Sequence, residues 1–369
     1  MHKLNIYSMY AQYFRKALLM LFLGFLGTTF LSCGKKGSSE ISESAGTEKT
    51  IILAKWLEEN GNYINSPEIP SIVDSHVVYS MRNDNILVID LRPEADFNEG
   101  HIEHAINLKQ SEVIDFFKNK INPGSFKGIF FVCNNMSRSG YTAGVMRLLG
   151  YDNVFAIRFG MSGWDRKVAE NYWIANVSNQ LLGKLESTVN PKNKAGKLPE
   201  IKASGNTGYD IAMERAEEIL KNNENYGITI KEWLANPEAY YTICYWPEDK
   251  YISNGHLPGS VQYQPKSSLG LDMELNTLPV DKPIVIYCYS GQHSTYVTSY
   301  LRMLGYDARS LVYGANAFIH ETMAKTEPRP TRTFTENLIQ NLPVVSTEIT
   351  EPAEVNIVKE EKIKVMGGC

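Results

Sequence analysis

The sequence is poor in cysteine and nearly balanced in charge, and each feature excludes a class of protein. Its 369 residues contain five cysteines, none of them in a C-x-x-C pair, which excludes a disulfide scaffold and a zinc ribbon. The net charge of -4 provides no basic surface for nucleic acid, so we expect no nucleic-acid partner. The sequence has no metal-ligand spacing, and we expect neither a metal nor another cofactor. Hydrophobic residues at 43% and charged residues at 21% are typical of a globular protein.

Long apolar runs are absent except near the N-terminus. Basic residues without any acidic one precede the apolar stretch Ala17 to Phe30, which is shorter than the roughly 20 residues of a membrane-spanning helix. This pattern is typical of a signal peptide. The stretch ends before Cys33 in a sequence that resembles the lipobox of bacterial lipoproteins, and this resemblance implies a lipidated Cys33. The alternative is an ordinary secretory signal with an incidental cysteine. We therefore predict a signal peptide over residues 1–32 and a flexible tether over 33–49.

An internal repeat organises the remaining chain. Three pairs of matching segments are each separated by 155 residues: Gly100-His101-Ile102 with Gly255-His256-Leu257, Cys133 with Cys288, and the Leu-Gly-Tyr-Asp segments that end at Asp152 and Asp307. A period of this length indicates two copies of one domain. We place copy one at residues 50–182 and copy two at residues 209–325. Residues 183–208 are predicted to be a linker, and residues 326–369 a flexible tail.

Each copy has an α/β pattern. Short apolar runs at Asn85–Asp90, Gly128–Val132 and Pro283–Tyr287 predict buried strands. Helical spacing follows at Ser139–Leu149 and ends at a glycine, and copy two repeats it as far as Leu304. Each repeated cysteine is therefore expected at the carboxyl end of a parallel strand and at the N-terminus of a helix. Open α/β sheets place their sites at this position.

The cysteine loops favour chemistry at a thiolate. A helix N-terminus carries unpaired N–H groups and a partial positive charge, both of which stabilise an anion. The permanently charged Arg138 can bind an anionic substrate. We predict Cys133 and Cys288 as nucleophiles and the loop residues as the substrate cradle: Asn134, Asn135, Met136, Ser137, Arg138 and Ser139 in copy one, and Tyr289, Ser290, Gly291, Gln292, His293 and Ser294 in copy two.

With these motifs in order, both copies resemble rhodanese domains. The shared features are Asp90-Leu91-Arg92-Pro93 after a strand, the Gly-His-Ile and Gly-His-Leu segments, the loop cysteine and the Leu-Gly-Tyr-Asp turn. The resemblance implies two α/β domains, each a parallel sheet flanked by helices. It also implies a sulfurtransferase that carries sulfur as a cysteine persulfide from thiosulfate or a persulfide donor to a thiol or another nucleophile. Asp90 and Arg92 are expected to brace the loop, and His101 and His256 to be structural.

Departures from the family pattern leave alternatives open. The C-x4-R spacing from Cys133 to Arg138 is shorter than the C-x5-R loop of phosphatases of this fold and suits sulfur better. Copy two has Cys244 and Trp246 where copy one has Asp90 and Arg92, and His293 in place of Arg138. We expect both loop cysteines to react. The alternative is a non-catalytic module that binds sulfide or a chalcogen oxyanion for a partner enzyme, and the identity of any protein partner stays open.

Two cysteines outside the loops complete the predictions. Cys244 lies among apolar and aromatic residues and is predicted to be a buried strand residue. Cys369 follows two glycines at the end of the predicted tail. It is either an incidental cysteine or a thiol that swings to a loop cysteine and carries sulfur away.

The lipid anchor has a direct test. We expect Cys33→Ala to release the protein from the membrane fraction of the bacterial envelope, because one residue carries the lipid that holds the protein on the periplasmic or cell-surface side. Fractionation of cells that express the substituted chain, with the unsubstituted chain as control, measures this. Unchanged membrane association would show that Cys33 is not the anchor.

Overall fold

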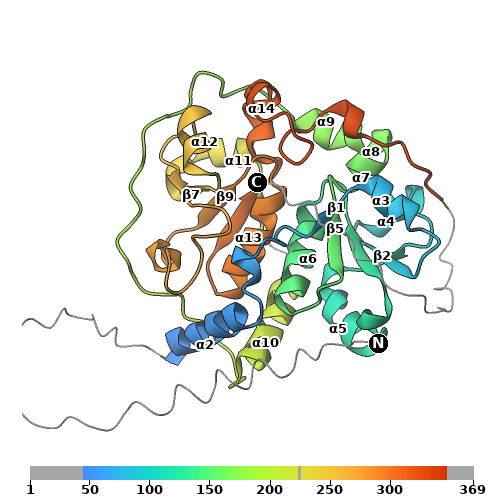
Figure 1. The fold of residues 1–369 in the computed structure, drawn as a ribbon, viewed down its shortest axis with the longest axis horizontal. Coiled ribbons are helices and arrows are strands. Elements are labelled where there is room, and N and C mark those ends of the chain that lie inside the picture. Colours follow the sequence, from blue (N-terminus) through green and yellow to red (C-terminus); the bar gives the residue numbers. More distant parts are fainter. Residues whose placement is uncertain (1–44, 223–225, 347–369) are drawn as a thin grey trace, which may run out of the picture. The chain divides into compact units, whose positions relative to one another are not determined.

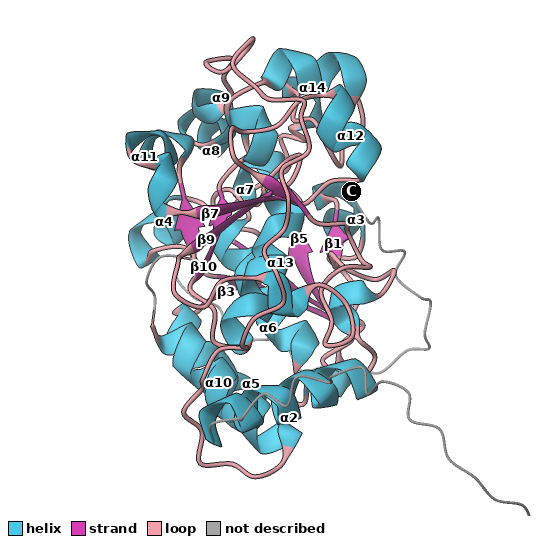
Figure 2. Cartoon of the chain, turned by 90° about the vertical axis from the view of Figure 1, so that its left-hand side faces the viewer, coloured by secondary structure: helices cyan, strands magenta, loops and turns pink. Residues whose placement is uncertain are grey.

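The computed structural model describes residues 45–222 and 226–346, and within them each copy contains one parallel sheet (Figure 1). The sheet of copy one has the strand order β1-β5-β4-β2-β3, and that of copy two has the matching order β6-β10-β9-β7-β8. All the strand pairs are parallel. The predicted class, two α/β domains with helices beside a parallel sheet, is confirmed (Figure 2).

Copy one contains the two strands and the helix that the sequence predicts, together with further elements. The predicted strands are β2 and β4, and the predicted helix is α6. The elements are α2 (Ala45–Glu59), β1 (Ile72–Val73), α3 (Ser75–Ser80), β2 (Ile86–Asp90), α4 (Glu94–Glu99), β3 (Ile106–Asn107), α5 (Val113–Asn119), β4 (Gly128–Val132), α6 (Ser137–Leu148), β5 (Val154–Ile157), α7 (Met161–Trp164), α8 (Arg166–Asn171) and α9 (Trp173–Asn176).

Copy two repeats the five strands in the same order, with fewer α-helices. The predicted strand is β9 and the predicted helix is α13. The elements are α10 (Gly208–Lys221), β6 (Gly227–Ile228), α11 (Ile230–Ala235), β7 (Tyr241–Cys244), α12 (Glu248–Ser253), β8 (Val261–Gln262), β9 (Ile284–Tyr287), α13 (Gln292–Met303), β10 (Ala308–Leu311) and α14 (His320–Thr326).

The two copies meet through α6 and α13, the helices that follow the repeated cysteines (Figure 1). The approach is close because α6 presents glycines there. A Cβ on Gly140 would lie 3.2 Å from Cγ2 of Thr295, and one on Gly144 would lie 3.1 Å from Cβ of Ser299. Tyr296 of α13 extends across the interface and donates a hydrogen bond of 2.6 Å to the carbonyl of Ser71. One hydrophobic core therefore contains residues of both copies.

The segments outside the two sheets are more ordered than predicted. Helix α2 begins at Ala45, so the end of the predicted tether is helical. The prediction of a flexible tail from residue 326 does not hold for its first part. In that part, the Trp164 indole donates to the carbonyl of Pro343, and the backbones of His101 and Val345 pair. We call residues 327–345 the C-terminal strap, because they run from copy two to copy one.

Other features concern the described residues only. Over residues 45–222 and 226–346, none of the helices has the length and apolar character needed to cross a membrane. In the same ranges, no three His, Cys, Asp or Glu side chains gather where they could hold a metal ion. Cys33, Cys369 and the predicted signal peptide lie outside the described residues.

The close helix contact predicts a steric effect on stability. We expect Gly144→Val to reduce the free energy of unfolding by about 1–3 kcal/mol, because the added methyl groups meet Ser299 and Tyr296 across the interface. The matched control is Gly124→Val, since a Cβ there has nothing nearer than 3.7 Å. Urea unfolding followed by circular dichroism measures both variants. Equal stability of the two variants would contradict this account of the interface.

Candidate functional site

Cys133 lies where the sequence predicted, between the end of β4 and the start of α6. Strand β4 is the central strand of its sheet and is fully buried, because all its residues are apolar apart from Gly128. Cys288 occupies the same place between β9 and α13. The structure therefore presents both cysteines at the carboxyl edge of a parallel sheet and next to a helix N-terminus, where backbone N–H groups favour a thiolate.

Ser139 and Ser294 contact the two sulfur atoms. The Sγ of Cys133 accepts hydrogen bonds from both the N–H and the hydroxyl of Ser139, each at 3.4 Å. The Sγ of Cys288 accepts one from the N–H of Ser294 at 3.4 Å. The hydroxyl of Ser294 lies 2.7 Å from that of Ser310 instead. Cys133 consequently has a second donor that Cys288 does not receive from Ser294.

The loop backbone is the same in both copies despite the substitution of glycine by methionine. Gly291 has φ +75°, and Met136 has φ 77°, a left-handed conformation that costs a residue other than glycine of the order of 1–3 kcal/mol. The Met136 side chain is buried in the core shared by the copies, and this burial favours the conformation. Met136 therefore keeps the same loop geometry that Gly291 has in copy two.

A second segment braces each cysteine loop from behind. The N–H of Met161 donates to the carbonyl of Cys133 at 2.7 Å, and the N–H of Ala315 donates to that of Cys288 at 3.1 Å. A glycine precedes each donor because a Cβ on Gly160 would lie 2.1 Å from the Cys133 carbonyl oxygen. Gly160 and Gly314 thus allow two backbone segments to touch directly behind the cysteine.

Asp90 and Arg92, which were predicted to brace the loop, bond to each other and to the neighbouring backbone. Arg92 forms a buried ion pair with Asp90 at 2.7 Å and donates to the carbonyl of Gly100. His101 stacks on Phe97 with ring centroids 3.8 Å apart, and its Nδ1 lies 2.9 Å from the Phe97 carbonyl oxygen. These contacts hold the loop after β2 in place, and none of them reaches the Cys133 sulfur.

Copy two replaces that ion pair with aromatic packing. Trp246 stacks on Tyr289 of the cysteine loop, with ring centroids 4.7 Å apart. Cys244 is fully buried, as predicted, and burial raises its pKa well above the ordinary value. His256 repeats the structural contact of His101 by stacking on Tyr251. Cys244 is therefore a neutral core thiol in this environment.

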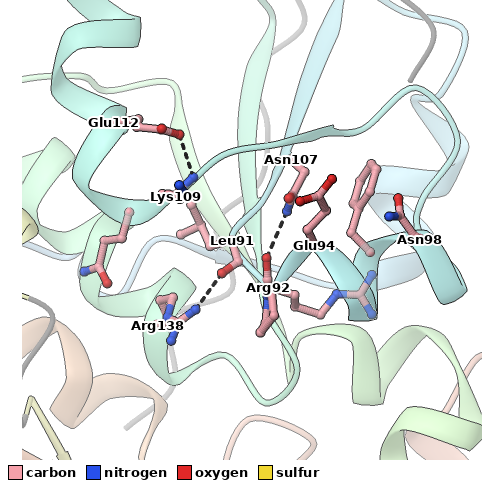
Figure 3. A pocket seen from close by; sticks show the side chains of 11 residues that line it. Leu91, Arg92, Glu94, Asn98, Asn107, Lys109, Glu112 and Arg138 are labelled. Atoms are coloured by element: carbon pink, nitrogen blue, oxygen red, sulfur yellow. Dashed lines mark hydrogen bonds between the residues drawn. The ribbon is translucent and has the colours of Figure 1, made fainter. Parts of the chain in front are cut away.

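Arg138 lies in the first turn of α6 and lines a pocket of about 320 Å³ (Figure 3). Its Nη1 donates to the carbonyl of Leu91 at 2.8 Å, and its Nε donates to the hydroxyl of Tyr226 at 3.2 Å. Burial opposes the charge of Arg138, but Tyr226 and Cys133 outweigh it and raise the pKa. Arg138 is consequently a permanent cation that interacts electrostatically with Cys133.

His293 does not take the place of Arg138. It is 1% exposed and lies edge-on to the Tyr245 ring, with centroids 5.1 Å apart. A histidine enclosed in this way lacks the access to solvent that a small anionic substrate would use. The two copies therefore differ at the fifth residue after each cysteine, which is the half-buried Arg138 in copy one and the enclosed His293 in copy two.

The two cysteine loops also contact the opposite copy. Asn135 donates to the hydroxyl of Tyr313 at 3.1 Å, and the Gln292 side chain accepts from the N–H of Phe159 at 2.9 Å. Trp173 packs edge-on against Tyr313 and donates to the carbonyl of Asn135. Tyr226 and Tyr313 were missed from the sequence because their contacts lie across the repeat, where spacing within one copy gives no signal. Trp173 was missed as well, although its hydrogen bond to Asn135 lies within copy one.

The loops differ most in exposure. Around Cys133, the side chains of Asn134, Asn135, Ser137 and Arg138 are half-buried, and Cys133 itself is 4% exposed. Every predicted loop residue of copy two, from Tyr289 to Ser294, is buried together with Cys288.

The C-terminal strap covers the loop of copy two. The hydroxyl of Ser290 donates to the carbonyl of Thr331, and the Arg332 guanidinium lies 4.5 Å from the centre of the Tyr289 ring. Arg332 also pairs with the buried Glu327. The strap therefore closes the approach to Cys288.

Comparisons with known proteins identify the domain that is repeated. The Rhodanese-like domain model matches residues 75–167 and again residues 237–321. The uncharacterized protein YibN of Escherichia coli K12 is 27% identical over 84 residues, which are 23% of this chain and 59% of the relative's length. The matched residues thus span about three fifths of that relative's length.

Solved structures give further similarities. Thiosulfate sulfurtransferase from Pseudomonas aeruginosa is 14% identical, with 72% of this chain and 46% of that chain covered and a TM-score of 0.26. The human single-domain sulfurtransferase TSTD1 is 17% identical, with 29% of this chain and 98% of that chain covered and a TM-score of 0.22.

The unequal exposure predicts unequal alkylation. Under native conditions we expect iodoacetamide to modify Cys133 at least about ten times faster than Cys288, because local opening is required to reach a sealed thiol. Arg332→Ala should raise the rate at Cys288, since it removes the contact with Tyr289 and the ion pair with Glu327. Cys244 is the internal control and should stay unmodified in both proteins. Peptide mass spectrometry over a time course measures the three rates, and equal rates at Cys133 and Cys288 would contradict the sealing of copy two.

Proposed function

The chain is a tandem rhodanese-domain protein, and on that premise we propose that it is a sulfurtransferase whose principal working thiol is Cys133. Its thiolate attacks the outer sulfur of a sulfane donor such as thiosulfate. The bond between the two sulfur atoms of the donor breaks, sulfite leaves with the electron pair, and Cys133 becomes a persulfide. A thiol or another nucleophile then takes the outer sulfur and restores the thiolate. No external oxidant or reductant is needed.

The observation that carries this proposal is the surroundings of the Cys133 sulfur. Two donors from Ser139 and the N-terminus of α6 stabilise negative charge on Sγ. The Arg138 cation lies beside them and attracts an anionic donor. After transfer, the same groups stabilise the charge of the persulfide, so the adduct remains bound.

Copy two has a different part in this proposal. Cys288 keeps the N–H contact with Ser294, but its loop is covered by the strap and lacks the arginine. The reactivity of Cys288 remains a prediction that needs the strap to open. The alternative for the chain, a non-catalytic module that binds sulfide or a chalcogen oxyanion, applies most naturally to copy two.

The proposal includes the cell envelope as the place of action. A lipid on Cys33 would hold the two domains at a membrane surface, and Cys369 would act as a mobile thiol near the loops. Both residues lie outside the described part of the chain, so both roles are drawn from the sequence.

Sulfur loading tests the proposal directly. After treatment with thiosulfate, we expect intact-mass analysis to show one added sulfur on Cys133, and cyanide to release it as thiocyanate. Cys133→Ser should abolish turnover, whereas Cys288→Ser should retain most of it. Arg138→Gln should lower kcat/KM for thiosulfate roughly 10–100-fold, because a charge-assisted hydrogen bond is lost.

The control for Arg138 is Arg82→Gln, which removes an exposed arginine that stacks on Tyr79. Its kinetics should match those of the unsubstituted chain. Absence of both sulfur loading and thiocyanate release would favour the binding module over the enzyme.

A further inference from the structure

Three tyrosine hydroxyls accept hydrogen bonds from side chains of the Cys133 loop. The pairs are Tyr172 with Asn134 at 2.6 Å, Tyr313 with Asn135 at 3.1 Å and Tyr226 with Arg138 at 3.2 Å. In each pair the loop side chain is the donor, so the proton of the phenol itself is directed elsewhere. Among the described residues, none accepts the proton of any of these three hydroxyls. The loop is therefore accompanied by three hydrogen-bond donors that are available to a ligand.

The three tyrosines come from both copies. Tyr172 lies between α8 and α9 of copy one, whereas Tyr226 precedes β6 and Tyr313 follows β10 in copy two. Tyr172 and Tyr226 are half-buried, and Tyr313 is 7% exposed. Each of them interacts electrostatically with Cys133, and Tyr172 also interacts with Tyr313. The three hydroxyls consequently share the neighbourhood of one sulfur atom.

The three phenols are neutral donors at neutral pH. Burial raises the pKa of Tyr313 to about 12, and it is the largest cause that raises the pKa of Tyr172 and of Tyr226. The carboxylate that interacts with Tyr172 is that of Asp96, and it accepts the second amide proton of Asn134 at 2.9 Å. The tyrosines therefore add donors, but no charge, to the Arg138 cation. This combination suits an anion with several oxygen acceptors.

The step proposed for Cys133 produces such an anion. When the Cys133 thiolate attacks the outer sulfur of thiosulfate, a new sulfur–sulfur bond forms and the bond to the central sulfur breaks. The electron pair leaves with sulfite, so negative charge grows on the three oxygens during the step. Donors that are already in place where charge develops lower the barrier. Three phenol protons are available for three oxygens.

From this arrangement we infer that Tyr172, Tyr226 and Tyr313 form an oxyanion site, which binds the three oxygens of the sulfur donor and stabilises sulfite as it leaves. The inference rests on the function proposed for Cys133, and it assigns recognition of the donor to residues outside the cysteine loop. Copy two supplies two of the three hydroxyls, so the site is incomplete in copy one alone. A donor without oxygen, such as inorganic polysulfide, gains nothing from it.

The loop of copy two lacks both asparagines of this arrangement. It has Tyr289 and Ser290 at the positions of Asn134 and Asn135. The hydroxyl of Ser290 donates to the carbonyl of Thr331 in the C-terminal strap. The oxyanion site therefore belongs to Cys133 and has no counterpart built from the same residue types at Cys288.

The first experiment measures binding without sulfur transfer. Thiosulfate is the probe, titrated calorimetrically into the full chain with Cys133→Ala. Binding should be saturable, and Tyr172→Phe and Tyr313→Phe should each weaken it about tenfold, because each variant loses one donor to an anion and keeps its ring. Neither hydroxyl accepts from Arg138, so the loss does not arise through the arginine. Thiocyanate, an anion without oxygen, should not distinguish the variants.

The second experiment measures loading of sulfur on Cys133 from saturating thiosulfate and from inorganic polysulfide. Each of the three Tyr→Phe variants should load about tenfold more slowly from thiosulfate and at an unchanged rate from polysulfide. General damage to the loop would slow both donors. Tyr226→Phe should also slow loading from thiosulfate in the Arg138→Gln background, where its contact with the arginine is already absent.

The matched control is Tyr209→Phe, at an exposed tyrosine of α10 that packs edge-on against Trp56. It should bind and load as the unsubstituted chain does. If thiosulfate binds through the tyrosines but sulfur never loads, the proposed function fails and the oxyanion site stands. If sulfur loads equally fast in the Tyr→Phe variants, or if both donors slow equally, the inference is overturned and the proposed function stands. If thiosulfate neither binds nor loads, both fail.

Discussion

The packing of α6 against α13 is the constraint on which the rest of the structure depends. Each of these helices begins at a cysteine loop, so their contact also fixes how the two loops lie with respect to each other. The glycines of α6 allow the two backbones to approach closely, and Tyr296 secures the contact from the α13 side. The pairs Asn135 with Tyr313 and Gln292 with Phe159 then connect each loop to the opposite copy.

This arrangement makes the Cys133 site a product of both copies. Arg138 is held by the carbonyl of Leu91 from its own copy and by Tyr226 from the other. Tyr226 in turn stacks on Tyr141 of α6, with ring centroids 4.5 Å apart. Copy two thus contributes Tyr226, which orients Arg138 beside Cys133. This contribution does not depend on the reactivity of Cys288. Duplication has here produced a pair in which one member supports the other.

Much of the fold and of the first site could be predicted from the sequence, because the signals involved are local. A buried strand, a cysteine and a helix follow one another within one stretch, and the repeat supplied a second example of each. The bracing roles of Asp90, Arg92 and His101 came from the family resemblance and agree with their contacts. The burial of the second loop could not be predicted, because it depends on Arg332 and Glu327, which lie outside the repeated unit. Low hydrophobicity made the strap resemble a flexible tail, although backbone hydrogen bonds and a few aromatic contacts hold it in place.

The path of the strap has a consequence for the order in which the chain folds during synthesis. Domains generally form as units from the N-terminus as the chain leaves the ribosome. Copy one, however, obtains contacts at its Trp164 indole and at the His101 backbone from Pro343 and Val345. These partners are synthesised after the whole of copy two. The first domain to emerge is therefore the last to be completed, and its Trp164 indole and His101 backbone stay without these partners until the second domain has been made.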